Sequence, residues 1–168
     1  MLPGLYVHVP FCRSKCPYCD FYSIASTSPV DGWLDGLKRE ILFLKDRFGR
    51  FDTLYLGGGT PSFLSTEVLE KVMTCIFGHF HLTTNAEITI EANPSDINPN
   101  KANALKVLGF NRINLGVQSF NDDILKFLGR RHSAEKVEKA IASLRSAGFI
   151  NIGLDLIYGL KAQSMKAW

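Results

Sequence analysis

Three cysteines stand close together near the start of the chain, in the segment Cys12-Arg13-Ser14-Lys15-Cys16-Pro17-Tyr18-Cys19. Thiolates are soft ligands, and three of them on one loop can converge on a single metal centre. On a cubane of four irons, three cysteines leave one iron free to coordinate a small molecule. The spacing therefore favours a cluster with inner-sphere chemistry over one that only carries electrons.

Three other interpretations of the cysteines stay open at this point. Cys16-Pro17-Tyr18-Cys19 alone is similar to a glutaredoxin dithiol, which leaves Cys12 without a role. A structural zinc would take His8 as its fourth ligand, although a histidine on a regular strand more often bonds to its neighbours. A merely buried thiol is the plainest interpretation, and it fits Cys75, which lies on an apolar helical stripe.

A run of three glycines occurs in Leu56-Gly57-Gly58-Gly59-Thr60-Pro61, directly after an expected strand. Such a run exposes backbone N–H and C=O groups, which can hold an ammonium, a carboxylate or a phosphate. It lacks the lysine of a P-loop and the spacing of a dinucleotide fingerprint. Because a tight turn seldom needs three consecutive glycines, we predict that this turn contacts a ligand.

Short strand-like runs alternate with longer helical ones, so successive strands are expected to be parallel. The expected strands are Leu5–Val9, Thr53–Leu56, Glu87–Glu91, Arg112–Gln118 and Asn151–Ile157. Helices are predicted to begin at Ser28 (a capping box with Asp31), Ser65, Asn98 and Ser133, and to end at Gly109 and Gly148. The pattern predicts an α/β fold, either a barrel or a doubly wound sheet.

Apolar and polar residues alternate along these strands with period two. Helices must cover the aliphatic face, so the polar face is expected to line an interior, where an unpaired charge would cost several kcal/mol if it were dry. A half-solvated antiparallel sheet gives the same alternation, but hairpins would join its strands. We therefore predict a polar-lined barrel with a wet or ligand-filled interior.

Polar residues stand at the carboxyl ends of several strands. These residues are Glu91, Gln118 and Asp155, and Arg130 follows shortly after the fourth strand. In parallel barrels that end carries the active site. Together with the cysteine loop and the glycine run, they place contributions from five strands on one rim.

The composition is that of one globular domain, with 168 residues of which 46% are hydrophobic and 21% charged. The net charge is only +3 and the basic residues are scattered, which argues against nucleic acid and anionic membranes as partners. No apolar run reaches the length of a membrane span, and the start lacks the features of a secretory signal. A reducing cytoplasm is the expected compartment.

Six segments together resemble the radical S-adenosylmethionine (SAM) superfamily, and within it the branch of oxygen-independent coproporphyrinogen III oxidases and haem chaperones (HemN/HemW-like). They are Tyr6–Cys12, the three-cysteine spacing, Gly57–Pro61, Glu91–Pro94, Leu115–Asn121 and Asp155–Gly159. The resemblance implies a partial (βα)6 barrel with about five βα units present. It also implies a [4Fe–4S] cluster whose free iron binds SAM, which is cleaved reductively to methionine and a 5′-deoxyadenosyl radical.

Carried over residue by residue, the resemblance makes Cys12, Cys16 and Cys19 the cluster ligands. It places Tyr6, Tyr18, Gly58 and Glu91 around the cluster-bound SAM. The positions that match contacts of a second SAM in the oxidases are Gly59, Thr60, Gln118, Arg130 and Asp155. The implied partners are haem or a porphyrin, an electron donor such as a flavodoxin-type protein, and a haem-recipient protein.

Departures from the oxidase pattern favour the chaperone side. The oxidases have a further cysteine two residues after the last ligand, where this chain has Phe21, and they carry a long N-terminal extension. Lys161 stands where the family usually has proline. Residues 1–168 are expected to be an incomplete radical SAM core domain that stops at Trp168, before the sixth strand and the C-terminal domain.

The resulting hypothesis is a HemW-like radical SAM protein that acts in haem handling or transfer. One alternative is a true oxygen-independent coproporphyrinogen III oxidase, although Phe21 argues against decarboxylation. The other is a non-catalytic haem carrier in which the cluster is structural.

Overall fold

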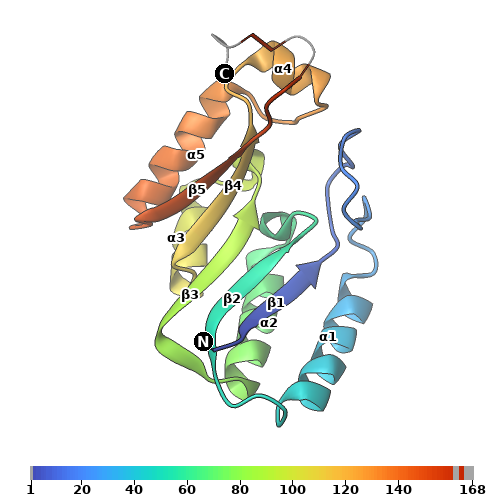
Figure 1. The fold of residues 1–168 in the computed structure, drawn as a ribbon, viewed down its shortest axis with the longest axis vertical. Coiled ribbons are helices and arrows are strands. Elements are labelled where there is room, and N and C mark those ends of the chain that lie inside the picture. Colours follow the sequence, from blue (N-terminus) through green and yellow to red (C-terminus); the bar gives the residue numbers. More distant parts are fainter. Residues whose placement is uncertain (1, 161–162, 165–168) are drawn as a thin grey trace.

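A five-stranded sheet forms the centre of the computed structural model, which describes residues 2–160 and 163–164 (Figure 1). Lys161 and Trp168 lie outside the described residues. The strands are β1 (Gly4–Val9), β2 (Phe51–Gly58), β3 (Leu82–Ala92), β4 (Arg112–Gln118) and β5 (Asn151–Leu156). The helices are α1 (Val30–Leu44), α2 (Thr66–His79), α3 (Pro99–Val107), α4 (Asp122–Phe127) and α5 (Ala134–Ser146), with 3₁₀ turns η1 (Pro61–Phe63) and η2 (Pro94–Asp96).

The strands follow one another in the sheet in the order β1-β2-β3-β4-β5, and each neighbouring pair is parallel. Because βα crossovers are right-handed, a sheet built in one direction keeps its helices on one face. A doubly wound sheet instead reverses its strand order and has helices on both faces. The structure therefore selects the barrel-type arrangement, as an open sheet in which β1 and β5 are the described edges.

The aliphatic face of the sheet is the core, as predicted. Leu54, Leu56, Ile90, Ile113 and Leu115 are fully buried and pack in one cluster with the inner faces of α2, α3 and α5. The strand β5 differs, since its Leu154 and Leu156 remain 39% and 40% exposed. Among the described residues no helix follows β5 to cover this face. None of the described helices is long and apolar enough to span a bilayer.

Three of the four predicted helix starts are confirmed. The side chains of Ser65, Asn98 and Ser133 each accept a hydrogen bond from a backbone N–H in the first turn of α2, α3 and α5. The capping box at Ser28 is wrong, because Pro29 is the N-cap of α1 and no side chain caps it. The Ser28 hydroxyl lies 3.1 Å from the Ser26 hydroxyl instead. Ser28 stands one residue before the N-cap, which is too early to cap the helix.

Three helices end in the same glycine turn. Gly109 and Gly148 have φ of +94° and +84°, which confirms both predicted helix ends. Gly129 ends α4 in the same way with φ of +67°, an end that was not predicted. In each turn the next residue bonds back across the last helical turn; at Gly129 this bond runs from Arg130 N–H to the Leu125 carbonyl. The turn after α4 therefore fixes the backbone of Arg130.

Candidate functional site

A cavity of about 610 Å³ lies over the polar face of the sheet at the carboxyl ends of the strands. This volume is in the usual range for small-molecule sites. All twelve residues that the sequence singled out line this one cavity: Tyr6, Cys12, Cys16, Tyr18, Cys19, Gly58, Gly59, Thr60, Glu91, Gln118, Arg130 and Asp155. The structure thus brings together residues from β1 to β5 and the loops between them.

The glycine turn after β2 uses its N–H groups inside the protein. Gly59 N–H donates to the Val9 carbonyl and Thr60 N–H to the Phe11 carbonyl, both at 2.8 Å, and Gly58 N–H donates to Glu91 at 3.0 Å. With these donors taken, the turn is no anion nest, and its carbonyl oxygens are what it offers to a ligand. Of the ammonium, carboxylate and phosphate predicted as ligands of this turn, only the ammonium can bond to carbonyl oxygens.

Two of these positions admit no side chain. A Cβ on Gly59 would stand 2.8 Å from the carbonyl oxygens of Val9 and Phe11, which are backbone atoms held in the sheet and loop. Gly58 has a φ of +111°, and a Cβ there would collide with the His8 ring. The glycines therefore let β1 and the turn approach each other at the floor of the cavity.

Glu91 is held by donors on both carboxylate oxygens. Its Oε1 accepts from the Tyr55 hydroxyl at 2.8 Å and its Oε2 from Gly58 N–H at 3.0 Å. Burial and this bond to Glu91 raise the pKa of Tyr55 well above its usual value, so Tyr55 stays a proton donor. Burial, with the Glu91 charge, also raises the pKa of Tyr6. The Tyr6 and Tyr55 rings stack with centroids 6.0 Å apart.

His8 has both ring nitrogens occupied, as expected for a residue of the polar face. Nε2 lies 3.0 Å from the Tyr22 carbonyl, which can only accept, so Nε2 carries the proton. In the neutral ring Nδ1 then accepts from the Tyr6 hydroxyl at 3.1 Å. Because both nitrogens are used, the structure disfavours His8 as a fourth zinc ligand.

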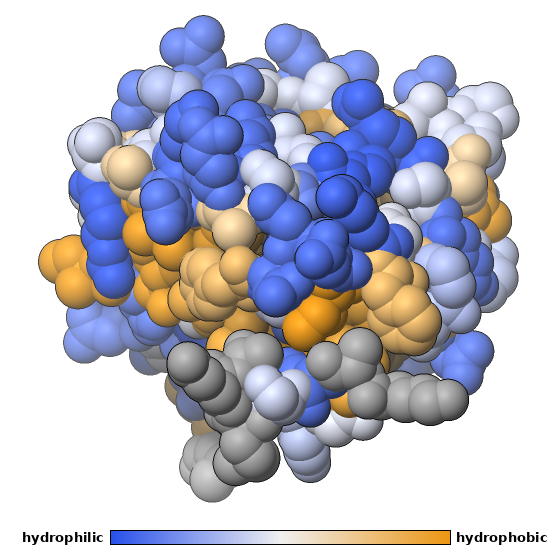
Figure 2. Space-filling view, turned by 90° about the horizontal axis from the view of Figure 1, so that it is seen from above, coloured by the Kyte–Doolittle hydropathy of each residue, from blue (hydrophilic) through white to orange (hydrophobic). Residues whose placement is uncertain are grey.

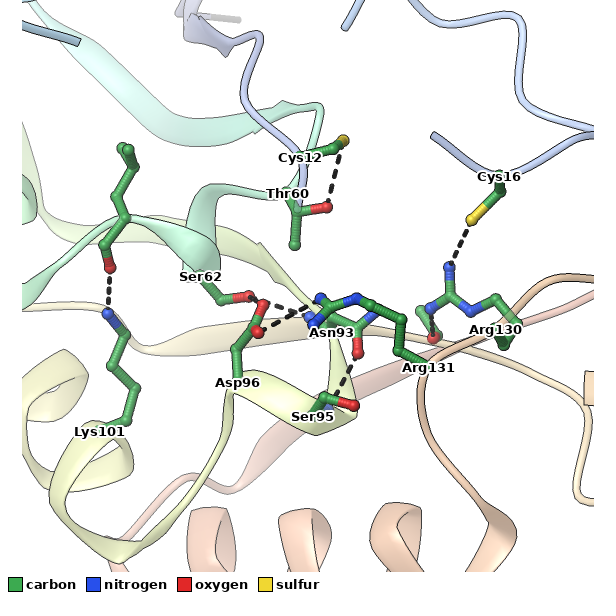
Figure 3. Close-up of polar contacts among 12 residues, drawn as sticks. Cys12, Cys16, Thr60, Ser62, Asn93, Ser95, Asp96, Lys101, Arg130 and Arg131 are labelled. Atoms are coloured by element: carbon green, nitrogen blue, oxygen red, sulfur yellow. Dashed lines mark hydrogen bonds and ion pairs between the residues drawn. The ribbon is translucent and has the colours of Figure 1, made fainter. Parts of the chain in front are cut away.

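Arg130 places a cation beside the cysteine loop. Its Nη1 lies 3.7 Å from Cys16 Sγ (Figure 3). The same Nη1 lies 3.3 Å from the Tyr18 hydroxyl, and Nη2 donates to the Gly116 carbonyl. Burial raises the pKa of Tyr18 to about 12, against the opposing effect of the Arg130 charge. Arg130 Nε is buried without a partner among the described residues. Because Arg130 also lines the cavity, its positive charge is suited to an anionic ligand group.

The three loop cysteines are free thiols that line the cavity and are half-buried. Cys12 Sγ lies 3.5 Å from the Thr60 hydroxyl, while Cys16 contacts Arg130 (Figure 3). In the described part of the chain no three His, Cys, Asp or Glu side chains are already arranged as a metal site. Cys75 lies apart, where it packs against the core from α2. Three soft sulfur donors on one loop match the three ligands of a cubane that has one iron without a cysteine.

Gln118 and Asp155 line the cavity at the ends of β4 and β5. Gln118 has a φ of +70°, which is unusual for a residue with a side chain and costs of order 1–3 kcal/mol. Its carbonyl accepts from Ile157 N–H at 3.0 Å, which holds the strained backbone. Both oxygens of Asp155 accept from Asn114 Nδ2, at 3.0 and 2.8 Å. Strain of this kind is typical of functional sites.

Tyr55, Asn114 and Arg131 are among the lining residues that were not singled out as site residues. Tyr55 and Asn114 lie on the polar face of β2 and β4, so the alternation already contained their signal. Arg131 is next to Arg130 and also lines the cavity. Its place in the sequence does not show where its side chain points. Seen from above (Figure 2), hydrophobic surface lies among hydrophilic groups on this face. Phe21, on the cysteine loop, lines the cavity and is 69% exposed.

The fold and this site agree with the comparison to known families. The model of the radical SAM superfamily matches residues 6–168. The chain belongs to the radical SAM superfamily. Membership of this family implies a [4Fe–4S] cluster and SAM as cofactors.

Two relatives are heme chaperones. The chain is 41% identical to the heme chaperone HemW of Lactococcus lactis, with 96% of this chain and 42% of the relative covered. It is 42% identical to the heme chaperone HemW of Bacillus subtilis, with 98% of this chain and 45% of the relative covered. The chain thus spans less than half the length of these relatives.

A solved structure gives the same fold. Coproporphyrinogen III oxidase (HemN) from Escherichia coli, described as a radical SAM enzyme, superposes with a TM-score of 0.90 at 33% identity. The superposition covers 98% of this chain and 39% of the oxidase. The expected fold, a partial radical SAM barrel with an open sheet, is therefore confirmed.

Proposed function

We propose that this chain is the cofactor-binding core of a haem-chaperone-type radical SAM protein, which binds a [4Fe–4S] cluster and SAM in one cavity. The observation that carries the proposal is the convergence of twelve residues, spread from Tyr6 to Asp155, on that cavity. The identities of 41% and 42% to two HemW proteins support the chaperone branch. Phe21, in place of the additional cysteine of the oxidases, points the same way.

Cys12, Cys16 and Cys19 are the proposed cluster ligands, because they are free, half-buried and on one loop at the cavity. When bound, the reduced cluster supplies one electron that breaks a C–S bond of SAM, which gives methionine and a 5′-deoxyadenosyl radical. Arg130 contacts both Cys16 and Tyr18 of the loop, so it places a positive charge beside the proposed cluster ligands.

The remaining cavity residues are proposed to hold SAM by complementary charge and hydrogen bonding. The carbonyl oxygens of the glycine turn at Gly58 and Gly59 suit the methionine ammonium, since their N–H groups are already bonded. Arg130 suits the methionine carboxylate, because it lines the cavity and carries a positive charge. Glu91 and Gln118 are placed to bond ribose hydroxyls.

Other contacts complete the proposed SAM site. Tyr6 provides a ring wall beside Glu91, and its stacking on Tyr55 fixes that wall. Thr60 and Asp155, with Gly59, Gln118 and Arg130, mark the positions that match contacts of a second SAM in the oxidase branch. If only the residues around the cluster are used, one SAM binds per chain. If the positions that match the second SAM are used as well, two SAM molecules bind.

Haem or a porphyrin is the proposed ligand of the whole protein, with a flavodoxin-type electron donor and a haem-recipient protein as partners. The names of the HemW relatives support this assignment. The cytoplasm is the proposed compartment, and four free cysteines are suited to its reducing conditions.

Anaerobic reconstitution with iron and sulfide tests the cofactor proposal. We expect about four irons per chain, and 5′-deoxyadenosine after reduction in the presence of SAM. Cys16→Ser is expected to lose both, whereas Cys75→Ser, a matched change outside the cavity, keeps both. A colourless wild-type chain that takes up only zinc would reject the proposal.

Two further assays separate the branches. We expect the reconstituted chain to bind haemin and to form no protoporphyrinogen from coproporphyrinogen III. Protoporphyrinogen formation would reassign the protein as an oxidase. Haemin binding with a loaded cluster and no 5′-deoxyadenosine would reassign it as a carrier with a structural cluster.

A further inference from the structure

A buried carboxylate lies just outside the cavity, at the point where three loops of the site meet. Asp96 belongs to η2, after β3, and its side chain is only 7% exposed. Its Oδ2 accepts from the Ser62 hydroxyl at 2.9 Å, and its Oδ1 pairs with Arg131 Nη2 at 3.4 Å (Figure 3). Ser62 lies in η1, after β2, and Arg131 follows β4 and α4. One side chain thus connects the segments that follow three successive strands.

Each partner of Asp96 adjoins residues of the proposed SAM site. Ser62 stands two residues after Thr60 and is itself 2% exposed, and its oxygen also accepts from Asn93 N–H at 3.0 Å. Asn93 stands two residues after Glu91. Arg131 is next to Arg130 and, unlike Asp96, lines the cavity.

Nearby groups fix the carboxylate in place. Lys101 of α3 donates to the Leu64 carbonyl at the end of η1, so α3 and η1 are tied together beside Asp96. Burial lowers the pKa of Lys101, while the Asp96 charge opposes that shift, which places the two charges within electrostatic reach. The Asp96–Arg131 pair is mostly shielded from solvent, so it is screened less than the exposed pairs of the surface.

We infer that Asp96 is a positioning residue for the cofactor cavity: through Ser62 and Arg131 it holds the glycine turn and Arg130 at the spacing that SAM requires. The inference rests on the proposed function for its SAM part. Arg130 is also held by the Gly116 carbonyl, and His132 by the Val117 carbonyl, so loss of Asp96 shifts the segment without freeing it. A moderate loss of affinity is therefore expected, with the fold retained.

The test uses Asp96→Asn and Arg131→Gln, alone and together, with Asp35→Asn as the matched control. Asp35 pairs with Lys38 at 3.8 Å on the exposed surface of α1, far in sequence from the site. At equal iron content, we expect Asp96→Asn and Arg131→Gln each to raise the Kd of SAM about tenfold. The double variant is expected to lose little more than either single variant, because both changes break the same pair.

Hydrogen exchange of the iron-free chain gives a readout that does not depend on SAM. Asp96→Asn is expected to speed amide exchange in both the turn at Gly57–Leu64 and the segment at Gly129–His132, with exchange in the β2 and β4 core unchanged. Unchanged exchange in either segment would overturn the positioning role. Equal speeding of exchange across the whole chain, with a lower melting temperature, would overturn it in favour of a general structural role.

The two proposals fail in different ways. A wild-type chain that takes up no cluster and binds no SAM contradicts the proposed function, and the exchange data then decide the positioning role by themselves. A wild-type chain that binds SAM, together with an Asp96→Asn variant of unchanged Kd at full iron content, contradicts the positioning role and leaves the proposed function supported.

Discussion

The glycine turn and the cysteine loop line the same cavity but are held in different ways. The turn is bonded through Gly58, Gly59 and Thr60 to β3, β1 and the start of the cysteine loop. The cysteine loop is fastened at its ends, where Cys12 N–H bonds to the Ile24 carbonyl, and is mostly exposed between them. Hydrogen bonds within the protein therefore hold the turn in its conformation without a ligand.

This contrast indicates which half of the site depends on its ligand. Among the described residues the thiols form no ready-made metal site, although they face one cavity. Metal sites of this kind reach their geometry when the metal binds, so binding energy is spent on ordering the loop. The residues proposed for SAM need no such step, because Glu91 and the turn already fix each other.

The largest expected effect comes from changes in the cysteine loop, the part of the site that depends on its ligand. Serine at Cys12, Cys16 or Cys19 removes one of three thiolates, and we expect bound iron to fall from about four per chain to less than about one. Cys75→Ser is expected to keep a full complement. Iron analysis and the visible absorbance of anaerobic preparations measure this; a loop variant that still holds a full cluster would remove that cysteine from the ligand set.

The next largest effect comes from a change beside the glycine turn, the part of the site that is already formed, and leaves the cluster intact. Glu91→Gln removes a charge that accepts from Gly58 N–H and the Tyr55 hydroxyl. Because charge-assisted bonds of this kind contribute about 1.5–3 kcal/mol, we expect the Kd of SAM to rise about 10–100-fold. Calorimetry at equal iron content measures it, with Glu135→Gln on the surface of α5 as the control. A loss of iron in Glu91→Gln would contradict the division into two halves.

A smaller effect concerns the stability of the turn. Gly59→Ala places a Cβ against two backbone carbonyl oxygens, and overpacking of this kind costs about 1–3 kcal/mol of unfolding free energy. Gly49→Ala, whose Cβ meets nothing within 4 Å, is expected to change stability little. Urea unfolding of the iron-free chain compares the two. Equal stability of both variants would show that the turn is looser than its hydrogen bonds indicate.

The last effect is a pH dependence at the base of the Arg130 segment, which is seen only when the pH is lowered. Burial lowers the pKa of His132 to about 4 from its ordinary 6.5, while its Nε2 donates to the Val117 carbonyl. Between these two values the unfolded chain holds a proton that the folded chain lacks, so stability is complete above pH 6.5 and falls as the pH drops. The slope is at most about 1.4 kcal/mol per pH unit.

His132→Gln keeps a donor toward Val117 and removes the titration. Urea unfolding of both proteins from pH 7 to pH 4 is therefore expected to give a steeper decline for the wild type. Parallel declines would mean that His132 is protonated as easily in the folded chain as in the unfolded one.

The sequence was sufficient for the strands and for most of the rim because both follow from local patterns. The alternation of apolar and polar residues shows which face of the sheet a side chain lies on. The position at the carboxyl end of a parallel strand shows which edge it lies near. Both rules predicted Glu91 and Asp155 at the same cavity, which they line. The short helix α4 and the early start of β3 at Leu82 were not predicted. That extension pairs with β2 across a register shift near Phe51, which no local pattern marks.

Contacts between loops were beyond local patterns. Asp96, Ser62 and Arg131 lie in short turns whose side-chain directions depend on how three loops pack against one another. Their roles arise from tertiary contacts between residues that lie up to 69 positions apart, from Ser62 to Arg131. The thiol geometry is likewise absent from the local sequence, because it depends on the metal as well as on the loop.

Mössbauer spectroscopy of the chain loaded with ⁵⁷Fe, before and after SAM is added, shows whether three cysteines hold a cluster with one iron open to SAM. We expect one cubane per chain, in which SAM alters the signal of a single iron and leaves the three cysteine-bound irons unchanged. A chain without a cubane, or a cubane whose four irons are all indifferent to SAM, would contradict it.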